Sequence, residues 1–360
     1  WIGVAIAAPI RGLKLPRLVV ASLAIAIVAV QFSRNFWLMD QSENYTIQDY
    51  GYAHLTNLPL NSTLLVKGDL ITNSIRYLQC CEGVRPDVIH LDQSMMTYRW
   101  FKKTQQKHLR HIKLPGDYYN PYEQKGYSLG ELLDDYAHDP DAPMFLCGGW
   151  YHEEPQDSGG ISGYTLKPYG ACDRIVANDK QPDVWEWLEE AKEVMPMATE
   201  KWPMKDLSKY SADTWEVVAA SDFWSMRHKL PFHLLNVAIA ANNDMAMLEE
   251  CIGLFEQLLA DHPEPVPEYF YKNAGIAYGR VRSFEAHEKM AEYFKKYLKA
   301  TKEGPEQTAE VKRVVDDWER QVKAMGRQNI PRQANPEVAG DSSRSDKKKK
   351  KKKKSKHARH

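Results

Sequence analysis

The sequence has 360 residues, of which 43% are hydrophobic and 27% charged, so it is long enough for two or three domains and apolar enough to bury a core. Its formal net charge is zero, but residues 341–360 hold nine Lys, two Arg and two Asp, a net charge of +9, which leaves −9 for the rest. An acidic body of this kind excludes a typical nucleic-acid-binding protein.

The N-terminal region contains two apolar runs. The first, at residues 1–10, begins at Trp1 rather than Met, and we interpret it as the end of a longer upstream segment. Residues 17–38 include an uncharged stretch and an aromatic end, and they predict a transmembrane helix, although so short a run also suits a buried core helix. The connector at residues 11–17 holds three positive charges, Arg11, Lys14 and Arg17, which predicts that it is cytosolic and that everything after about residue 35 is luminal.

Two N-glycosylation sequons agree with a lumen-facing chain. Asn44 begins Asn-Tyr-Thr and Asn61 begins Asn-Ser-Thr, and neither sequon contains proline. Such triplets occur often by chance, but both of these follow shortly after the predicted crossing. Asn44 and Asn61 are therefore the candidate glycan acceptors.

The sequence holds five cysteines, an odd number, so at least one is left out of any internal pairing. They are Cys80, Cys81, Cys147, Cys172 and Cys251. We favour buried free thiols for them. A disulfide between Cys147 and Cys172 remains the alternative, because an oxidising lumen permits it.

Residues 40–180 predict a luminal α/β domain. Thr63–Val66 is a short β-type run, residues 71–82 have helical spacing, and residues 87–91 form a second β-type run. This strand–helix–strand order favours a parallel pair of strands. Another strand is predicted at 143–147, so we expect a parallel sheet of a few strands.

Asp69 follows the first predicted strand, at the position where α/β proteins often bind ligands. We favour a role in which its carboxylate caps the next helix, but it could also hold a ligand hydroxyl or a metal ion. In another alternative, Asp69 and Asp87 form a catalytic carboxylate pair, which requires the two strand ends to meet. His108 and His111 are three residues apart but have no third ligand nearby, so no metal site is predicted.

Residues 181–328 are helical almost throughout and predict two degenerate repeats with a capping helix. The segments 230–261 and 267–301 each divide into two helices, and residues 236–240 resemble residues 273–277 at an offset of 37. Small residues at the helix crossing with a later aromatic are typical of tetratricopeptide (TPR) repeats, whose period is about 34 residues. Such repeats bind peptides or brace a neighbouring domain, and both alternatives stay open.

The C-terminal residues 329–360 are polar and contain eight consecutive lysines. Because they can bury no core, we predict a disordered polylysine tail. The sequons and the predicted crossing argue against a nuclear role for it.

A long motif lies in the predicted α/β domain. It reads Gly68-Asp69-x-x-Thr72, then Tyr77-Leu78-Gln79, then Glu82-Gly83-x-Arg85-Pro86-Asp87-Val88. The motif resembles the luminal signature that follows the last membrane span in one family of polytopic GT-C glycosyltransferases. This family comprises the protein O-mannosyltransferases that act on the IPT domains of plexins and related receptors. The resemblance covers most of residues 33–325, and it marks Asp69, Thr72, Arg85 and Asp87 as candidate ligand or structural-turn residues.

The resemblance implies an enzyme of the endoplasmic-reticulum membrane that takes mannose from dolichyl-phosphate mannose and transfers it to Ser or Thr of folded receptor IPT domains. It also implies a catalytic carboxylate in an early luminal loop, which this sequence does not contain. No catalytic residue and no bound cofactor are therefore expected here, and this part alone is expected to be inactive. The alternative is a non-enzymatic, membrane-anchored scaffold whose TPR-like repeats bind other proteins.

Overall fold

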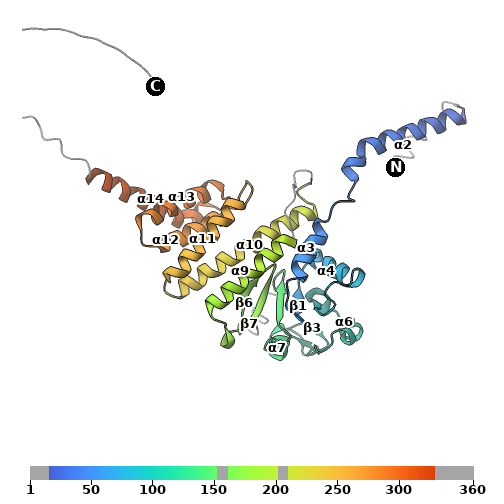
Figure 1. The fold of residues 1–360 in the computed structure, drawn as a ribbon, viewed down its shortest axis with the longest axis horizontal. Coiled ribbons are helices and arrows are strands. Elements are labelled where there is room, and N and C mark those ends of the chain that lie inside the picture. Colours follow the sequence, from blue (N-terminus) through green and yellow to red (C-terminus); the bar gives the residue numbers. More distant parts are fainter. Residues whose placement is uncertain (1–15, 152–160, 202–209, 329–360) are drawn as a thin grey trace, which may run out of the picture. The chain divides into compact units, whose positions relative to one another are not determined.

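The computed structural model describes residues 16–151, 161–201 and 210–328 (Figure 1). The chain up to Ala300 forms one compact unit, and a second unit begins at Thr301. The predicted apolar segment at 1–10 and the predicted polylysine tail at 329–360 lie outside the described residues.

Helix α2 (Arg17–Met39) occupies the position of the predicted crossing. Its segment Leu18–Trp37 has 20 residues and a mean hydropathy of 1.7, and no side chain of that apolar window is buried. Ile25, for example, is 69% exposed. Among the described residues, α2 is the one helix that is long and apolar enough to cross a bilayer. Its composition and exposure suggest a membrane anchor.

The α/β part is built on a five-stranded mixed sheet in the order β2-β1-β5-β7-β6. The strands are β1 (Thr63–Val66), β2 (Ile89–Asp92), β5 (Met144–Cys147), β6 (Tyr164–Tyr169) and β7 (Cys172–Ala177). β1 pairs in parallel with both β2 and β5, which confirms the predicted strand–helix–strand unit. β7 and β6 pair antiparallel, so the expected all-parallel sheet is wrong at this side.

Alternation along β1 sends neighbouring side chains into two different cores. Leu64 lies in a core with residues of α3 (Thr46–Leu55), α4 (Asp69–Cys81) and the later helices α9 (Val184–Lys201) and α10 (Trp215–Ala240). Leu65 lies in a second core with residues of α5 (Gln93–Met96), α6 (Arg99–Gln105) and α7 (Leu129–Tyr136). The sheet is therefore covered by helices on both faces.

The remaining short elements are η1 (Gln106–His108), β3 (Tyr118–Tyr119), β4 (Gly126–Tyr127) and η2 (Asn178–Lys180).

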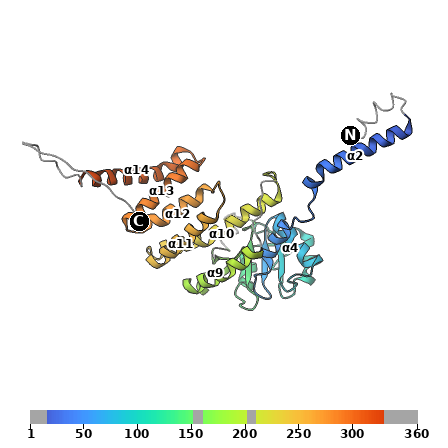
Figure 2. The ribbon, with the colours of Figure 1, turned by 45° about the horizontal axis from the view of Figure 1, so that its top comes forward.

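Two helical hairpins follow the sheet, and Figure 2 shows their helices in succession. Their helices are α10 with α11 (Met245–Asp261), and α12 (Glu268–Arg280) with α13 (Phe284–Ala300). The first break falls at the predicted place, where Asn242 and Asn243 have positive φ values of 58° and 62°. Asn tolerates this left-handed conformation, which ends α10. Helix α14 (Pro305–Gln328) belongs to the second unit.

The two helices of the second hairpin approach closely at Gly275. A Cβ atom on Gly275 would lie 2.5 Å from Cδ1 of Phe294, whose side chain is almost fully buried. The predicted correspondence of small and aromatic residues thus marks a real helix crossing at this point.

This crossing gives a stability prediction with a matched control. Gly275→Ala should lower the free energy of unfolding by about 1–3 kcal/mol, because the new methyl group overpacks against Phe294. A Cβ atom on Gly253 in α11 would meet no atom within 4 Å, so Gly253→Ala should raise stability by about 0.5–1 kcal/mol through helix propensity. Urea unfolding of both variants measures the difference. Equal stability of the two variants would contradict the close crossing.

Candidate functional site

Asp69 is the first residue of α4, and its side chain is exposed. The N-cap position before it is taken by Gly68, at φ 112°, and no side chain caps the helix. The prediction that Asp69 is the cap is therefore wrong. The physical reason is a one-residue shift: the conformation at Gly68 favours glycine, and Asp69 already lies inside the helix.

Thr72 lies one turn further along α4 and is only 4% exposed. Its backbone N–H donates to the carbonyl oxygen of Gly68 at 3.1 Å, as part of the first turn of the helix. Thr72 therefore packs inside the fold, while Asp69 faces outward.

Arg85 and Asp87 form a clamp at the entrance to β2. Nε of Arg85 donates to Oδ1 of Asp87 at 2.8 Å, and Nη2 donates to Oδ2 at 2.7 Å. These hydrogen bonds lower the pKa of Asp87 to about 2. The other guanidinium hydrogens reach the backbone carbonyl oxygens of Leu55, Thr56, Leu58 and Pro59, at 3.3, 3.2, 2.6 and 2.8 Å. Arg85 thereby satisfies the free carbonyl groups at the end of α3.

The proposed catalytic pair of Asp69 and Asp87 does not form. β1 and β2 are parallel, with Thr63 opposite Ile89 and Val66 opposite Asp92. Asp69 follows the carboxyl end of β1, whereas Asp87 precedes the amino end of β2. The two carboxylates are therefore separated by about the length of a four-residue strand, roughly 13 Å. Asp69 lies at the carboxyl ends of these two parallel strands and Asp87 at their amino ends, so the alternative of a catalytic pair is wrong.

The carboxyl ends of β1 and β5 are neighbours at the topological switch point of the sheet, because β2 lies on one side of β1 and β5 on the other. Open α/β sheets often bind ligands at such a point. Here the gap is filled by the protein itself. A Cβ atom on Gly148 would lie 2.0 Å from the carbonyl oxygen of Lys67, and Nζ of Lys67 donates to the carbonyl oxygen of Trp150 at 2.7 Å. The carboxyl ends of β1 and β5 are therefore linked by the close backbone approach at Gly148 and by the side chain of Lys67.

A groove of about 790 Å³ lies beside the edge strand β2. It is lined by Trp100, which is 47% exposed, and by His90, whose buried Nε2 has no hydrogen-bond partner among the described residues. Burial, together with the charge of Arg76, lowers the pKa of His90 to about 3. Asp92, which sequence reasoning missed, caps α5 and pairs with Arg76 at 3.1 Å. Because the carboxylate of Asp92 already caps α5 and pairs with Arg76, it is not free to act as an acid or base in the groove.

Cys147 and Cys172 form a disulfide that joins the end of β5 to the start of β7. The favoured prediction of buried free thiols is wrong for this pair. It is also wrong for Cys80 and Cys81, which are free but exposed, and right for the buried thiol of Cys251. The antiparallel register of β5 and β7, which the sequence did not reveal, brings the two paired cysteines together.

The two sequon asparagines differ in their surroundings. Nδ2 of Asn44 donates to Oε1 of Gln41 and to Oε1 of Glu216, both at 2.7 Å. Asn61 is exposed at the tip of a turn with φ 59°, and its side chain makes no hydrogen bond with another described residue. Since a glycan is attached through Nδ2, Asn61 can accept one without loss of a native contact, whereas Asn44 cannot.

Known proteins match most of this chain, among them the following two. It is 29% identical to the mouse protein O-mannosyl-transferase TMEM260 over 265 aligned residues. These aligned residues make up 72% of this chain and 36% of the relative. It is 28% identical to the protein O-mannosyl-transferase tmem260 of Dictyostelium discoideum over 318 aligned residues, which make up 85% of this chain and 38% of the relative. No family model and no solved structure matches.

The resemblance to the protein O-mannosyltransferases is confirmed. Both relatives are named as protein O-mannosyl-transferases. The chain spans somewhat more than a third of the length of each relative, 36% and 38%.

The clamp gives a second stability prediction. Arg85→Met should lower the free energy of unfolding by about 2–4 kcal/mol, because it leaves a half-buried carboxylate and several carbonyl groups without partners. The free energy of unfolding of Arg85→Lys should lie between those of the wild type and Arg85→Met, because an ammonium group keeps the charge but cannot form the bidentate contact. Arg282→Met, at an exposed arginine between α12 and α13, is the control and should change stability by less than about 0.5 kcal/mol. Urea unfolding tests the series, and an Arg85→Met variant as stable as the control would refute the clamp.

Proposed function

We propose that this chain is a luminal part of an endoplasmic-reticulum protein O-mannosyltransferase. The whole enzyme would transfer mannose from dolichyl-phosphate mannose to Ser or Thr of folded receptor domains, including the IPT domains of plexins. The observation that carries this proposal is the similarity to two protein O-mannosyl-transferases over 72% and 85% of the chain.

In this proposal the catalytic carboxylate lies outside this chain, and the described residues position the acceptor or brace the enzyme. The motif residues support this division. Asp87 is hydrogen-bonded to Arg85, and Thr72 is buried. Asp69 lies at the opposite end of the paired strands β1 and β2 from Asp87. None of these arrangements offers a pair of carboxylates to a sugar.

The geometry near the bilayer fits a positioning role. A lipid-linked donor stays in the membrane, so transfer must occur at its surface. Residues 40–45, six in all, connect α2 to α3, which keeps the start of the α/β part within about 25 Å of the end of α2. A folded acceptor held on such a body would have its hydroxyl group oriented for reaction, which can contribute a large part of a rate enhancement.

A luminal position is supported by two chemical features. The first is the disulfide between Cys147 and Cys172. Disulfides persist in oxidising compartments and are rare in the cytosol. Asn61 presents its sequon side chain at the surface, where Nδ2 is accessible. We therefore propose that residues after about 35 face the lumen and that Asn61, rather than Asn44, carries the glycan.

The helical hairpins α10–α11 and α12–α13 are proposed to act as TPR-like repeats. Asn273 and Gly275 in α12 occupy positions that correspond to Asn236 and Ala238 in α10, and both hairpins contribute to one core that contains Ala238, Phe255 and Ala274. In the enzyme these repeats would contact the acceptor or the rest of the transferase.

A rescue experiment tests the proposal. The whole protein that contains this chain is expressed in cells that lack the endogenous O-mannosyltransferase, and mass spectrometry measures O-mannose on a plexin IPT domain. We expect the whole protein to restore mannose, and we expect the 360-residue chain alone to restore none. Deletion of residues 181–325 from the whole protein should reduce transfer to the folded acceptor at least tenfold.

Each outcome has a definite meaning. Failure of the whole protein to restore mannose would overturn the transferase assignment and leave the membrane-anchored scaffold as the better account. Undiminished transfer by the deletion variant would leave the assignment in place but refute the role of the helical part in positioning.

A further inference from the structure

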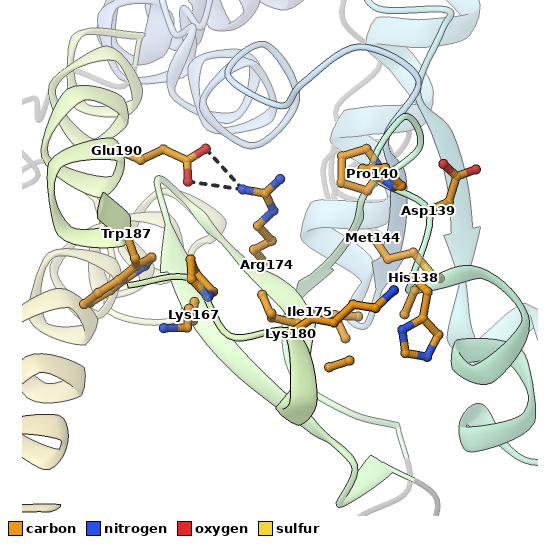
Figure 3. Close-up of a pocket in the computed structure, with 15 residues that line it drawn as sticks. His138, Asp139, Pro140, Met144, Lys167, Arg174, Ile175, Lys180, Trp187 and Glu190 are labelled. Atoms are coloured by element: carbon orange, nitrogen blue, oxygen red, sulfur yellow. Dashed lines mark hydrogen bonds and ion pairs between the residues drawn. The ribbon is translucent and has the colours of Figure 1, made fainter. Parts of the chain in front are cut away.

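A cavity of about 240 Å³ opens between the β6–β7 hairpin, helix α9 and the loop before β5 (Figure 3). Three basic side chains line it: Lys167, Arg174 and Lys180. Figure 3 shows Lys167 beside Trp187 on one side and Lys180 extending toward His138 on the other, with Arg174 between them.

The sheet register forces two of these cations together. Lys167 of β6 is the direct cross-strand partner of Arg174 of β7, so both side chains lie on the same face. Like charges in directly opposed positions destabilise a strand pair unless a counter-charge is present. Glu190 supplies that charge for Arg174 alone, with its two carboxylate oxygens 3.1 and 3.2 Å from Nη1.

No carboxylate among the described residues forms an ion pair with Lys167. The residue is only 4% exposed, yet its Nζ makes no ion pair and no hydrogen bond with another described residue. Nζ lies 5.2 Å from the centre of the Trp187 ring, which is a weak electrostatic contact. Burial lowers the pKa of Lys167, and the charge of Asp183 only partly opposes this shift. The Lys167 side chain is thus almost wholly covered, and no carboxylate among the described residues pairs with its ammonium group.

The carboxylates around the cavity are each engaged by other groups and none pairs with Lys167 or Lys180 among the described residues. Glu190 is occupied by Arg174, and Asp183 accepts backbone N–H groups of α9 at 2.9 and 3.4 Å. Asp139 accepts the backbone N–H of Asp141 at 2.9 Å, in the loop before β5. Lys180 is exposed and forms no ion pair within the described residues.

We propose that this cavity is an anion site that binds a phosphoryl group, with Lys167 and Lys180 as its cationic ligands. Two ammonium groups match a doubly charged anion better than a single carboxylate, and lysine binds phosphate as a point charge. The cavity volume accommodates a phosphate with a small organic group attached. The ligand is therefore a phosphate monoester, either free in solution or as a lipid headgroup. This site does not depend on the transferase assignment.

Titration calorimetry of the 360-residue chain in non-ionic detergent tests the site, with ionic strength held constant by KCl. The probes are inorganic phosphate and, in separate micelles, dioctanoyl phosphatidic acid, with dioctanoyl phosphatidylcholine as the lipid control. We expect saturable binding at one site, with Lys167→Met and Lys180→Met each weakening affinity at least tenfold. Lys299→Met, at an exposed lysine of α13, should stay within twofold of the wild type.

The two probes separate the two sources of the ligand. Lysine-dependent binding of inorganic phosphate supports a soluble phosphate ester, and lysine-dependent binding of phosphatidic acid alone supports a lipid headgroup. Lys167→Arg should retain binding, because it keeps the charge, and Lys180→Met alters an exposed side chain that the fold does not need. Equal binding by the wild type and both methionine variants, or no binding of either probe, would overturn the proposal.

Discussion

The side chain of Arg85 joins two segments that lie 26 to 30 residues apart in the chain, residues 55–59 and residues 85–87, at the entrances to the neighbouring strands β1 and β2. It contacts the end of α3, the loop that leads into β1 and the turn that leads into β2. Asp87 extends the same contact to the backbone N–H of Asn61, one residue before the buried Ser62 and Thr63. Because β1 lies between β2 and β5, a fixed entry to β1 sets the register of the parallel strands on both sides.

This constraint explains why so polar a motif lies in a structural position. An arginine with five N–H donors can serve a carboxylate and several carbonyl groups at once, which no other side chain can do. The motif that marks the resemblance to the O-mannosyltransferases therefore preserves the sheet in this chain. The described residues of the motif form a rigid body, and in our proposal the chemistry of mannose transfer belongs to another part of the protein.

Local patterns in the sequence predicted the elements whose structure is decided locally. The strand Thr63–Val66 and the break after α10 at Asn242 and Asn243 were found because apolar runs and turn-forming residues mark them. The β6–β7 hairpin was missed because β6 contains Lys167 and Pro168 and has no regular alternation of apolar and polar residues. The cation-lined cavity follows from the register of that hairpin, and the disulfide follows from the antiparallel pairing of β5 with β7. The sequence alone therefore left the disulfide as an alternative and did not indicate the cavity.

The central claim, that the residues after α2 face the lumen, is tested most directly by the glycan on the whole protein expressed in animal cells. Asn61→Gln and Asn44→Gln variants are compared with the wild type by endoglycosidase H digestion and gel mobility. The account predicts one sensitive glycan on the wild type and on Asn44→Gln, and none on Asn61→Gln. A wild-type protein without any glycan, or a glycan that survives in Asn61→Gln, would contradict it.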